Sequence, residues 1–195
     1  MVLTKQRFYT AEEYLKLEEQ AELRHEYIDG EIREIKGGTT NHNQIAGNIY
    51  AYFRRVLRGK NYKTYIENVR LWIEENRVFI YPDIMVIEGN PVYYGKGTTT
   101  VVNPCLIIEV LSKSTKNYDQ GDKFDFYRSL SSLQEYILVE QDRFHVIQYT
   151  KVSAIQWLLT EYELVSDELK LKAVSFSMSL EDIYEGVDFN LLESR

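Results

Sequence analysis

The stretch from residue 105 to residue 111, CLIIEVL, is apolar throughout except for one carboxylate, Glu109. Strands that are covered on both faces read as continuous apolar runs, whereas half-exposed strands alternate apolar and polar residues. The run therefore predicts a central strand with packing layers on both sides. This requirement limits the fold more than any other feature of the sequence.

The patterns before and after this run supply the flanking elements. Thr10 and Glu13 have the spacing of a capping box, and Asp29-Gly30 between apolar alternations predicts a hairpin. The expected order is a helix over 10–20, the hairpin over 24–36, an amphipathic helix over 41–58, strands over 63–73 and 77–87, a loop over 89–103, a helix over 117–131, and strands over 135–140, 143–150 and 154–162. This order predicts an α/β (α+β) fold with a mixed β-sheet flanked by helices.

The length of 195 residues suits one domain, and no linker or repeat divides the chain. We expect a single domain over residues 1–195, with a core over about 8–150 and an acidic, strand-rich extension over 151–195. Residues 161–195 hold 3 basic and 9 acidic residues, whereas residues 1–160 hold 20 and 21. Most of the net charge of −7 therefore belongs to the extension.

A local basic cluster in the first half contains Arg54, Arg55, Arg58, Lys60 and Lys63. Binding of a polyanion needs only a local basic surface, because counter-ions are released where phosphates meet cations. On its own, the cluster favours a solvated helix end over a binding surface.

The chain shows no sign of a membrane or secretory protein. No stretch approaches the roughly 20 consecutive apolar residues that span a bilayer, and the N-terminal residues lack the apolar core of a signal peptide. A single cysteine, Cys105, excludes an internal disulfide and a cysteine-based zinc site. We expect a cytoplasmic protein that does not contact a membrane.

Two carboxylates lie within apolar strand patterns, Asp83 in FIYPDIMVI and Glu109 in CLIIEVL. Burying an ionised carboxylate is costly unless it is paired, neutralised or bound to a metal. If the two strands are neighbours in a suitable register, the two acids lie side by side and favour a shared cation. Oxygen ligands of this kind suit Mg²⁺, with Mn²⁺ as an alternative. Each acid alone is also compatible with a strand end that reaches solvent or with a salt bridge.

Several short motifs, taken in their order along the chain, resemble the Uma2 family, which is abundant in cyanobacteria and lies in the PD-(D/E)XK nuclease superfamily. They are EYIDGEI from residue 26, a histidine at 42, YPDIMV from 81, NPCLIIEVLS from 103, DQGDKF from 119 and EYILV from 135. The resemblance covers about residues 8–150. The sequence departs from the usual family pattern at Lys113, where proline is common, and at Glu140, where aspartate often ends the strand.

The resemblance implies a PD-(D/E)XK restriction-endonuclease-like core and a set of site residues. It implies Asp83 and Glu109 as metal ligands, with the carbonyl of Val110 as a further ligand. Lys123 replaces the lysine that the superfamily motif places at position 111, where this chain has leucine. Glu26 corresponds to an additional N-terminal acid.

Lys123, Glu26 and His42 each also have an interpretation that involves no functional site. Lys123 lies four residues after Asp119, which is typical of an exposed ion pair on a helix. Glu26 is compatible with an acidic residue on the surface of the hairpin, and His42 with a surface residue near the start of a helix.

The expected function is that of a Mg²⁺-dependent endonuclease that hydrolyses phosphodiester bonds in DNA. Asp83 and Glu109 hold the ion, Lys123 and Glu26 complete the catalytic set, and nucleic acid contacts His42, Arg54, Arg55 and Arg58. The alternative is a module on the same fold that binds nucleic acid or regulates without turnover. A third possibility is a structural or interaction protein in which the acidic C-terminal segment and the tyrosines form a subunit interface. A homodimer is expected and is compatible with all three.

Overall fold

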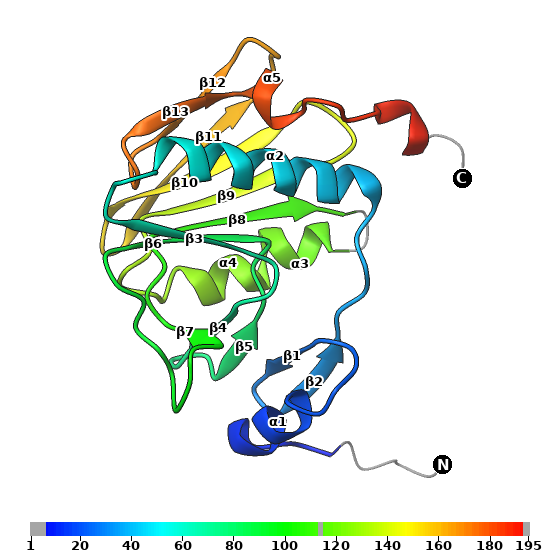
Figure 1. Cartoon of the computed structure of the whole chain (residues 1–195), viewed down its shortest axis with the longest axis vertical. Helices are drawn as coiled ribbons and strands as arrows, with labels where there is room; N and C mark the ends of the chain where they lie inside the picture. The colour runs from blue at the N-terminus through cyan, green and yellow to red at the C-terminus, as the bar shows by residue number, and fades with distance from the viewer. Residues whose placement is uncertain (1–6, 113–114, 193–195) are drawn as a thin grey trace.

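The computed structural model describes residues 7–112 and 115–192. Its larger sheet has six strands in the order β11-β10-β9-β8-β6-β3 (Figure 1). β8 and β9 are parallel, and the other neighbours are antiparallel, so the sheet is mixed as predicted. The strands are β3 (Tyr62–Ile66), β6 (Ile84–Glu88), β8 (Leu106–Leu111), β9 (Glu135–Glu140), β10 (Val146–Ser153) and β11 (Gln156–Tyr162).

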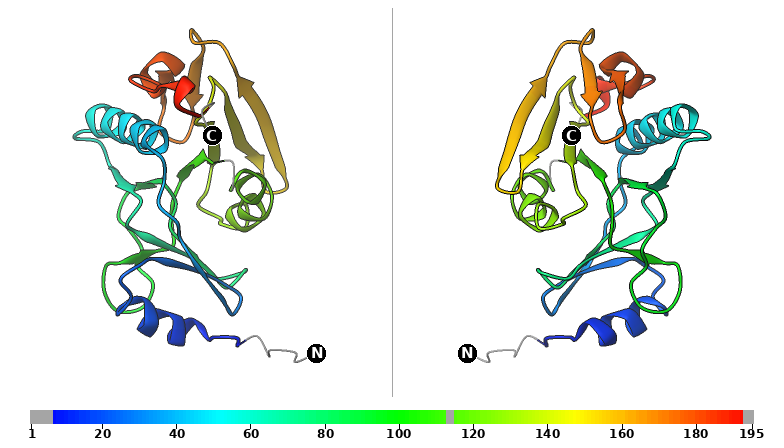
Figure 2. Two further views of the ribbon diagram at one scale, coloured as in Figure 1. Left: turned by 90° about the vertical axis from the view of Figure 1, so that its right-hand side faces the viewer. Right: turned by 90° about the vertical axis from the view of Figure 1, so that its left-hand side faces the viewer.

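Helices cover both faces of this sheet (Figure 2). α2 (Thr40–Val56) packs Ile45, Ile49 and Phe53 against one face, where the side chains of Ile108 and Val110 point. On the other face, Tyr127 of α4 (Asp122–Tyr127) packs with Ile107 and Leu111. Alternate residues of β8 thus enter two separate apolar clusters, which confirms the prediction of a strand covered on both sides.

A second sheet, in the order β2-β1-β5-β4-β7, lies below the first in Figure 1. α1 (Ala11–Glu18) begins with the predicted capping box at Thr10 and packs Tyr14 against Tyr27, Trp72 and Phe79. The hairpin of β1 and β2 turns at Asp29 and Gly30, whose φ angles of 41° and 103° match the left-handed turn that this dipeptide favours. The strands are β1 (His25–Ile28), β2 (Glu31–Glu34), β4 (Arg70–Ile73), β5 (Val78–Ile80) and β7 (Thr100–Val101).

The C-terminal segment packs on the α2 side of the larger sheet. It contains β12 (Glu168–Leu171), β13 (Phe176–Ser179), α5 (Leu180–Ile183) and a 3-10 helix, η1 (Phe189–Leu192). The carboxylate of Glu135 on β9 accepts hydrogen bonds from Gln148, Thr150 and the backbone N–H of Ala173. Residue 150, where we placed the end of the core, lies inside β10.

The predicted strands over 63–73 and 77–87 are wrong as continuous elements, because each divides between the two sheets. Glu67 adopts a left-handed φ of 52° between β3 and β4. Pro82 lies between β5 and β6, where a missing backbone donor is tolerated. Apolar alternation runs through both breaks and does not reveal them.

Two other elements also differ from expectation. The predicted helix over 117–131 is two short helices, α3 (Lys116–Gln120) and α4, which meet at Gly121. A Cβ at Gly121 would lie 3.0 Å from the carbonyl oxygen of Asn117, so a larger residue would crowd the junction. The predicted loop over 89–103 contains β7, and the last two strands begin at 146 and 156 rather than at 143 and 154.

Within the two described ranges, none of the helices combines the length and apolarity needed to cross a membrane.

Candidate functional site

Asp83 and Glu109 face each other at the ends of two neighbouring strands. The antiparallel register pairs Ile84 of β6 with Ile108 of β8, so the two acids occupy the next position beyond the ladder. The backbone N–H of Asp83 lies 3.3 Å from Oε2 of Glu109, and the N–H of Val110 donates to Oδ2 of Asp83 at 2.8 Å. The acids therefore lie side by side, although Asp83 immediately precedes β6 rather than lying within the strand.

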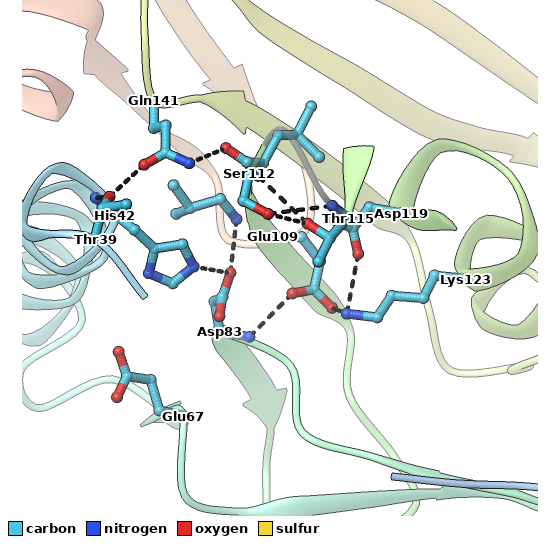
Figure 3. A network of polar contacts seen from close by, with 12 residues as sticks. Thr39, His42, Glu67, Asp83, Glu109, Ser112, Thr115, Asp119, Lys123 and Gln141 are labelled. Carbon is cyan, nitrogen blue, oxygen red and sulfur yellow. Dashed lines mark hydrogen bonds and ion pairs between the residues drawn. The ribbon is translucent and has the colours of Figure 1, made fainter. Parts of the chain in front are cut away.

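Lys123 on α4 brings its ammonium into the same site (Figure 3). Its Nζ lies 3.1 Å from Oε1 of Glu109, 3.0 Å from Oδ1 of Asp119 and 3.9 Å from Oε1 of Glu26. The pair with Asp119 exists, but it is buried rather than exposed, since the lysine side chain is only 10% accessible. Three carboxylates thus share one buried cation.

Glu26 reaches this site from the second sheet. It lies on β1 opposite Arg33 of β2, and the hydroxyl of Tyr118 on α3 donates to its Oε2 at 3.4 Å. Its contact with Lys123 joins the two sheets across the site. Burial raises the pKa of Glu26 above its ordinary value, although the charge of Lys123 acts in the opposite direction.

His42 is part of the site and not a free surface residue. Thr39 caps α2 and accepts from the N–H of His42, which places the imidazole at the first turn of the helix. Its Nε2 lies 3.1 Å from Oδ2 of Asp83, the oxygen that also accepts from Val110 (Figure 3). Asp83 is therefore held by a side chain on one side and by the backbone on the other.

The sequence interpretation missed two members of the site. Asp119 is buried beside Lys123, and the hydroxyl of Tyr127 donates to Oε1 of Glu109 at 2.5 Å. Lys123 and Tyr127 lie four residues apart on α4, and Asp119 on α3 lies four residues before Lys123, so this repeated spacing was an available signal.

Gln141 gave no such signal. Its Nε2 donates to the carbonyl oxygen of Leu111 at 2.9 Å, and its Oε1 accepts from the hydroxyl of Thr39, so it ties the end of β8 to the start of α2.

The electrostatic environment shifts the pKa values of the two central acids in opposite directions. Burial raises the pKa of Asp83, but the hydrogen bond and charge of His42 outweigh it and leave the pKa below its ordinary value. For Glu109, burial outweighs the attraction of Lys123, and the nearby charges of Asp83 and Asp119 raise its pKa further. Burial lowers the pKa of Lys123, but its three carboxylate neighbours raise it well above the ordinary value. The lysine therefore remains protonated and can only donate.

The site holds more negative than positive charge. The carboxylates of Glu26, Glu109 and Asp119 lie around the ammonium of Lys123, and the carboxylate of Asp83 pairs with His42, which adds at most one further positive charge. Oδ1 of Asp119 is buried and lacks an aligned hydrogen bond, although it lies within ion-pair distance of Lys123. Buried charge of this kind requires compensation, which a divalent cation would supply.

The donor set is consistent with a hard cation but is small. Within the described residues, no group of three or more His, Cys, Asp or Glu side chains is arranged to hold a metal ion. The expected set has only two carboxylates, Asp83 and Glu109, together with the carbonyl oxygen of Val110. Mg²⁺ is commonly bound through one or two carboxylates with waters and substrate phosphates completing the shell, so the residues fit this ion.

The basic residues do not join this site. Arg54 and Arg55 lie in the last turn of α2, and with Arg58, Lys60 and Lys63 they line a pocket of about 910 Å³. Twelve residues separate His42 from Arg54, which at about 1.5 Å per residue is roughly 18 Å along the helix.

Of the two departures from the usual family sequence, Lys113 lies outside the described residues. Glu140 forms ion pairs with Lys116, Arg143 and His145 and is not one of the proposed ligands.

One family model and two proteins of known sequence match most of this chain. The family model Uma2, described as "Putative restriction endonuclease", matches residues 11–181. The uncharacterized protein sll1609 of Synechocystis sp. (strain PCC 6803) is 42% identical over 161 residues, covering 83% of this chain and 91% of the relative. The uncharacterized protein slr1290 of the same organism is 35% identical over 178 residues, covering 91% and 92%.

One solved structure has the same restriction-endonuclease-like fold. It is described as a "putative nuclease belonging to DUF820" from Anabaena variabilis, and it aligns with a TM-score of 0.73 at 18% identity over 90% of this chain and 97% of that one. At this identity, the match concerns the fold alone. The family match over most of the chain and the two relatives together show that the chain belongs to the Uma2 family.

Proposed function

We propose that this protein is a metal-dependent endonuclease that hydrolyses phosphodiester bonds in DNA. The observation that carries the proposal is the excess of carboxylates over cations in a buried site, with Asp83 and Glu109 held side by side. The description of the Uma2 family supports a nuclease, and a nucleic acid is the substrate of that class of enzyme.

In this proposal, Asp83, Glu109 and the carbonyl oxygen of Val110 hold one Mg²⁺, and Mn²⁺ is an alternative. Such an ion lowers the pKa of a bound water and polarises a phosphoryl oxygen. The register of β6 and β8 brings the two acids to neighbouring positions, which supports their proposed role as ligands of one ion.

The other residues act through charge and position. Lys123 donates its protons toward the site and stabilises negative charge that develops on the phosphate. Glu26 and Asp119 also pair with the ammonium of Lys123 and help to position it. His42 and the N–H of Val110 both bind Oδ2 of Asp83, so they fix the orientation of that carboxylate.

A plasmid-cleavage assay with Mg²⁺, Mn²⁺ or EDTA tests the proposal. We expect cleavage by the wild type in either metal, and a loss of at least about 100-fold in Asp83→Asn and Glu109→Gln. Glu88→Gln is the matched control, because Glu88 is an exposed acid at the other end of β6. Cleavage by both site variants at the wild-type rate would exclude this site, and binding of DNA without cleavage in either metal would indicate the non-catalytic alternative.

A further inference from the structure

One segment of the chain has a charge opposite to that of the whole. Residues 35–66 contain six basic residues and no acidic residue, whereas the rest of the chain contains 17 basic and 30 acidic residues. The segment includes α2 and β3 and begins just before His42 enters the site. The segment therefore has a net charge of +6, whereas the rest of the chain has a net charge of −13.

The cations of this segment are exposed and free of ion pairs. Arg54, Arg58, Lys60 and Lys63 are exposed, and none of them takes part in an ion pair among the described residues. Arg55 stacks on the ring of Tyr52 at 4.9 Å and also has no carboxylate partner in that part of the chain. No acidic residue lines the pocket that these five cations surround.

The outer face of α2 connects this pocket to the site. Asn43, Gly47, Tyr50, Arg54 and Arg58 follow one another at helical spacing and are exposed or half-buried, and we call them the α2 stripe. A Cβ at Gly47 would meet no atom within 4 Å, so a ligand can approach the helix backbone there. The stripe passes from the turn that carries His42 to the basic pocket without an acidic residue.

We propose that the α2 stripe and the basic pocket bind the phosphate backbone of a DNA duplex at a distance from the bond that is cut. Exposed cations without ion-pair partners among the described residues, next to a helix face that has no acidic residue, suit the regularly spaced phosphates of a duplex. The separation of about 18 Å between His42 and Arg54 corresponds to roughly five base-pair steps of 3.4 Å. Only the identity of the polyanion rests on the proposed function.

Fluorescence anisotropy with a labelled 24-base-pair duplex in EDTA tests this surface without turnover. The variant Arg54→Ala/Arg58→Ala/Lys63→Ala removes three cations from the surface. The matched control Lys96→Ala/Lys170→Ala/Lys172→Ala removes three exposed cations from other elements. Thermal melting checks that both variants are folded.

We expect the pocket variant to bind at least about tenfold more weakly at 0.1 M salt than the control. Its plot of log affinity against log salt should be shallower by about 2.7, since each phosphate contact contributes about 0.9. Equal affinity and equal salt slopes in the two variants would overturn the inference, even if the wild type cleaves DNA. A weaker pocket variant supports it, even if no condition produces cleavage.

Discussion

Glu109→Gln should make the metal-free protein more stable while it removes the response to metal. Oε1 of Glu109 accepts from Lys123 and Tyr127, and an amide oxygen in the same place can accept both hydrogen bonds. Oε2 accepts one long bond of 3.3 Å from the backbone N–H of Asp83, so an amide nitrogen there would lose only this weak hydrogen bond. The change therefore removes a negative charge and keeps the packing.

The magnitude follows from the charges around position 109. Lys123 attracts the ionised carboxylate, but it already pairs with Asp119 and Glu26, while Asp83 and Asp119 repel it. Removing one partner of a buried ion pair usually costs about 3–5 kcal/mol because the other charge is left uncompensated, whereas removing surplus buried charge is neutral or stabilising by about 1–4 kcal/mol. Lys123 keeps Asp119 and Glu26 as partners, so the second case applies to Glu109→Gln. We expect the lower end, about 1 kcal/mol, which raises the melting temperature of a chain of this size by about 2–4 °C.

Differential scanning fluorimetry at pH 7.5, in EDTA and in Mg²⁺, measures both effects. In EDTA the variant should melt above the wild type. In Mg²⁺ at about 100 times the dissociation constant the wild type should gain about 2.7 kcal/mol, and the variant should not.

The matched control is Glu135→Gln on the neighbouring strand. Glu135 is also a buried acid in an apolar strand, but its oxygens accept from Gln148, Thr150 and the N–H of Ala173. The amide N–H groups of a glutamine there would meet groups that themselves donate, so we expect the free energy of unfolding to fall by about 1–3 kcal/mol. If Glu109→Gln destabilises the metal-free protein as much as Glu135→Gln does, Glu109 is a structural acid and the reasoning about excess charge is wrong.

Three further predictions concern the site's surroundings. Lys123→Met leaves buried carboxylates without their cation and should cost about 3–5 kcal/mol in urea unfolding; a loss below 1 kcal/mol would contradict the buried ion cluster. Burial raises the pKa of Glu140, but Lys116 outweighs it and lowers the pKa below 4.5, so this carboxylate stabilises the fold above pH 4.5 and the stabilisation is lost as pH falls below that value. The urea midpoints of wild type and Glu140→Gln should therefore differ at pH 7 and converge near pH 3, whereas a constant difference would refute the linkage. Gly30→Ala should destabilise by about 1 kcal/mol because Gly30 has a φ of 103°, and an unchanged melting temperature would show that the hairpin turn can rearrange.

The sequence was sufficient to find the two central acids, because an apolar strand rarely tolerates an unpaired carboxylate. Their juxtaposition required the register of β6 and β8, which apolar periodicity leaves open. Asp119 went unrecognised as a site residue because its spacing from Lys123 is equally typical of an exposed pair.

The division of strands between two sheets was not predictable from periodicity. Residues 63–73 remain compatible with one strand, and only the left-handed φ of Glu67 marks the turn. That turn matters for the site, since the backbone N–H of Glu67 donates to the carbonyl oxygen of Asp83 at 2.9 Å. The helix rise gives the separation of Arg54 from His42, but the sequence did not show that the first turn of α2 meets the site, because this depends on the direction of α2 relative to the sheet.

A crystal soaked with Mn²⁺ tests the central claim most directly, since the anomalous signal locates the ion. We predict one peak between the carboxylates of Asp83 and Glu109, within coordination distance of both and of the carbonyl oxygen of Val110. The peak should disappear in Asp83→Asn. Full occupancy of Mn²⁺ elsewhere, with no peak between these two acids at saturating metal, would contradict the account.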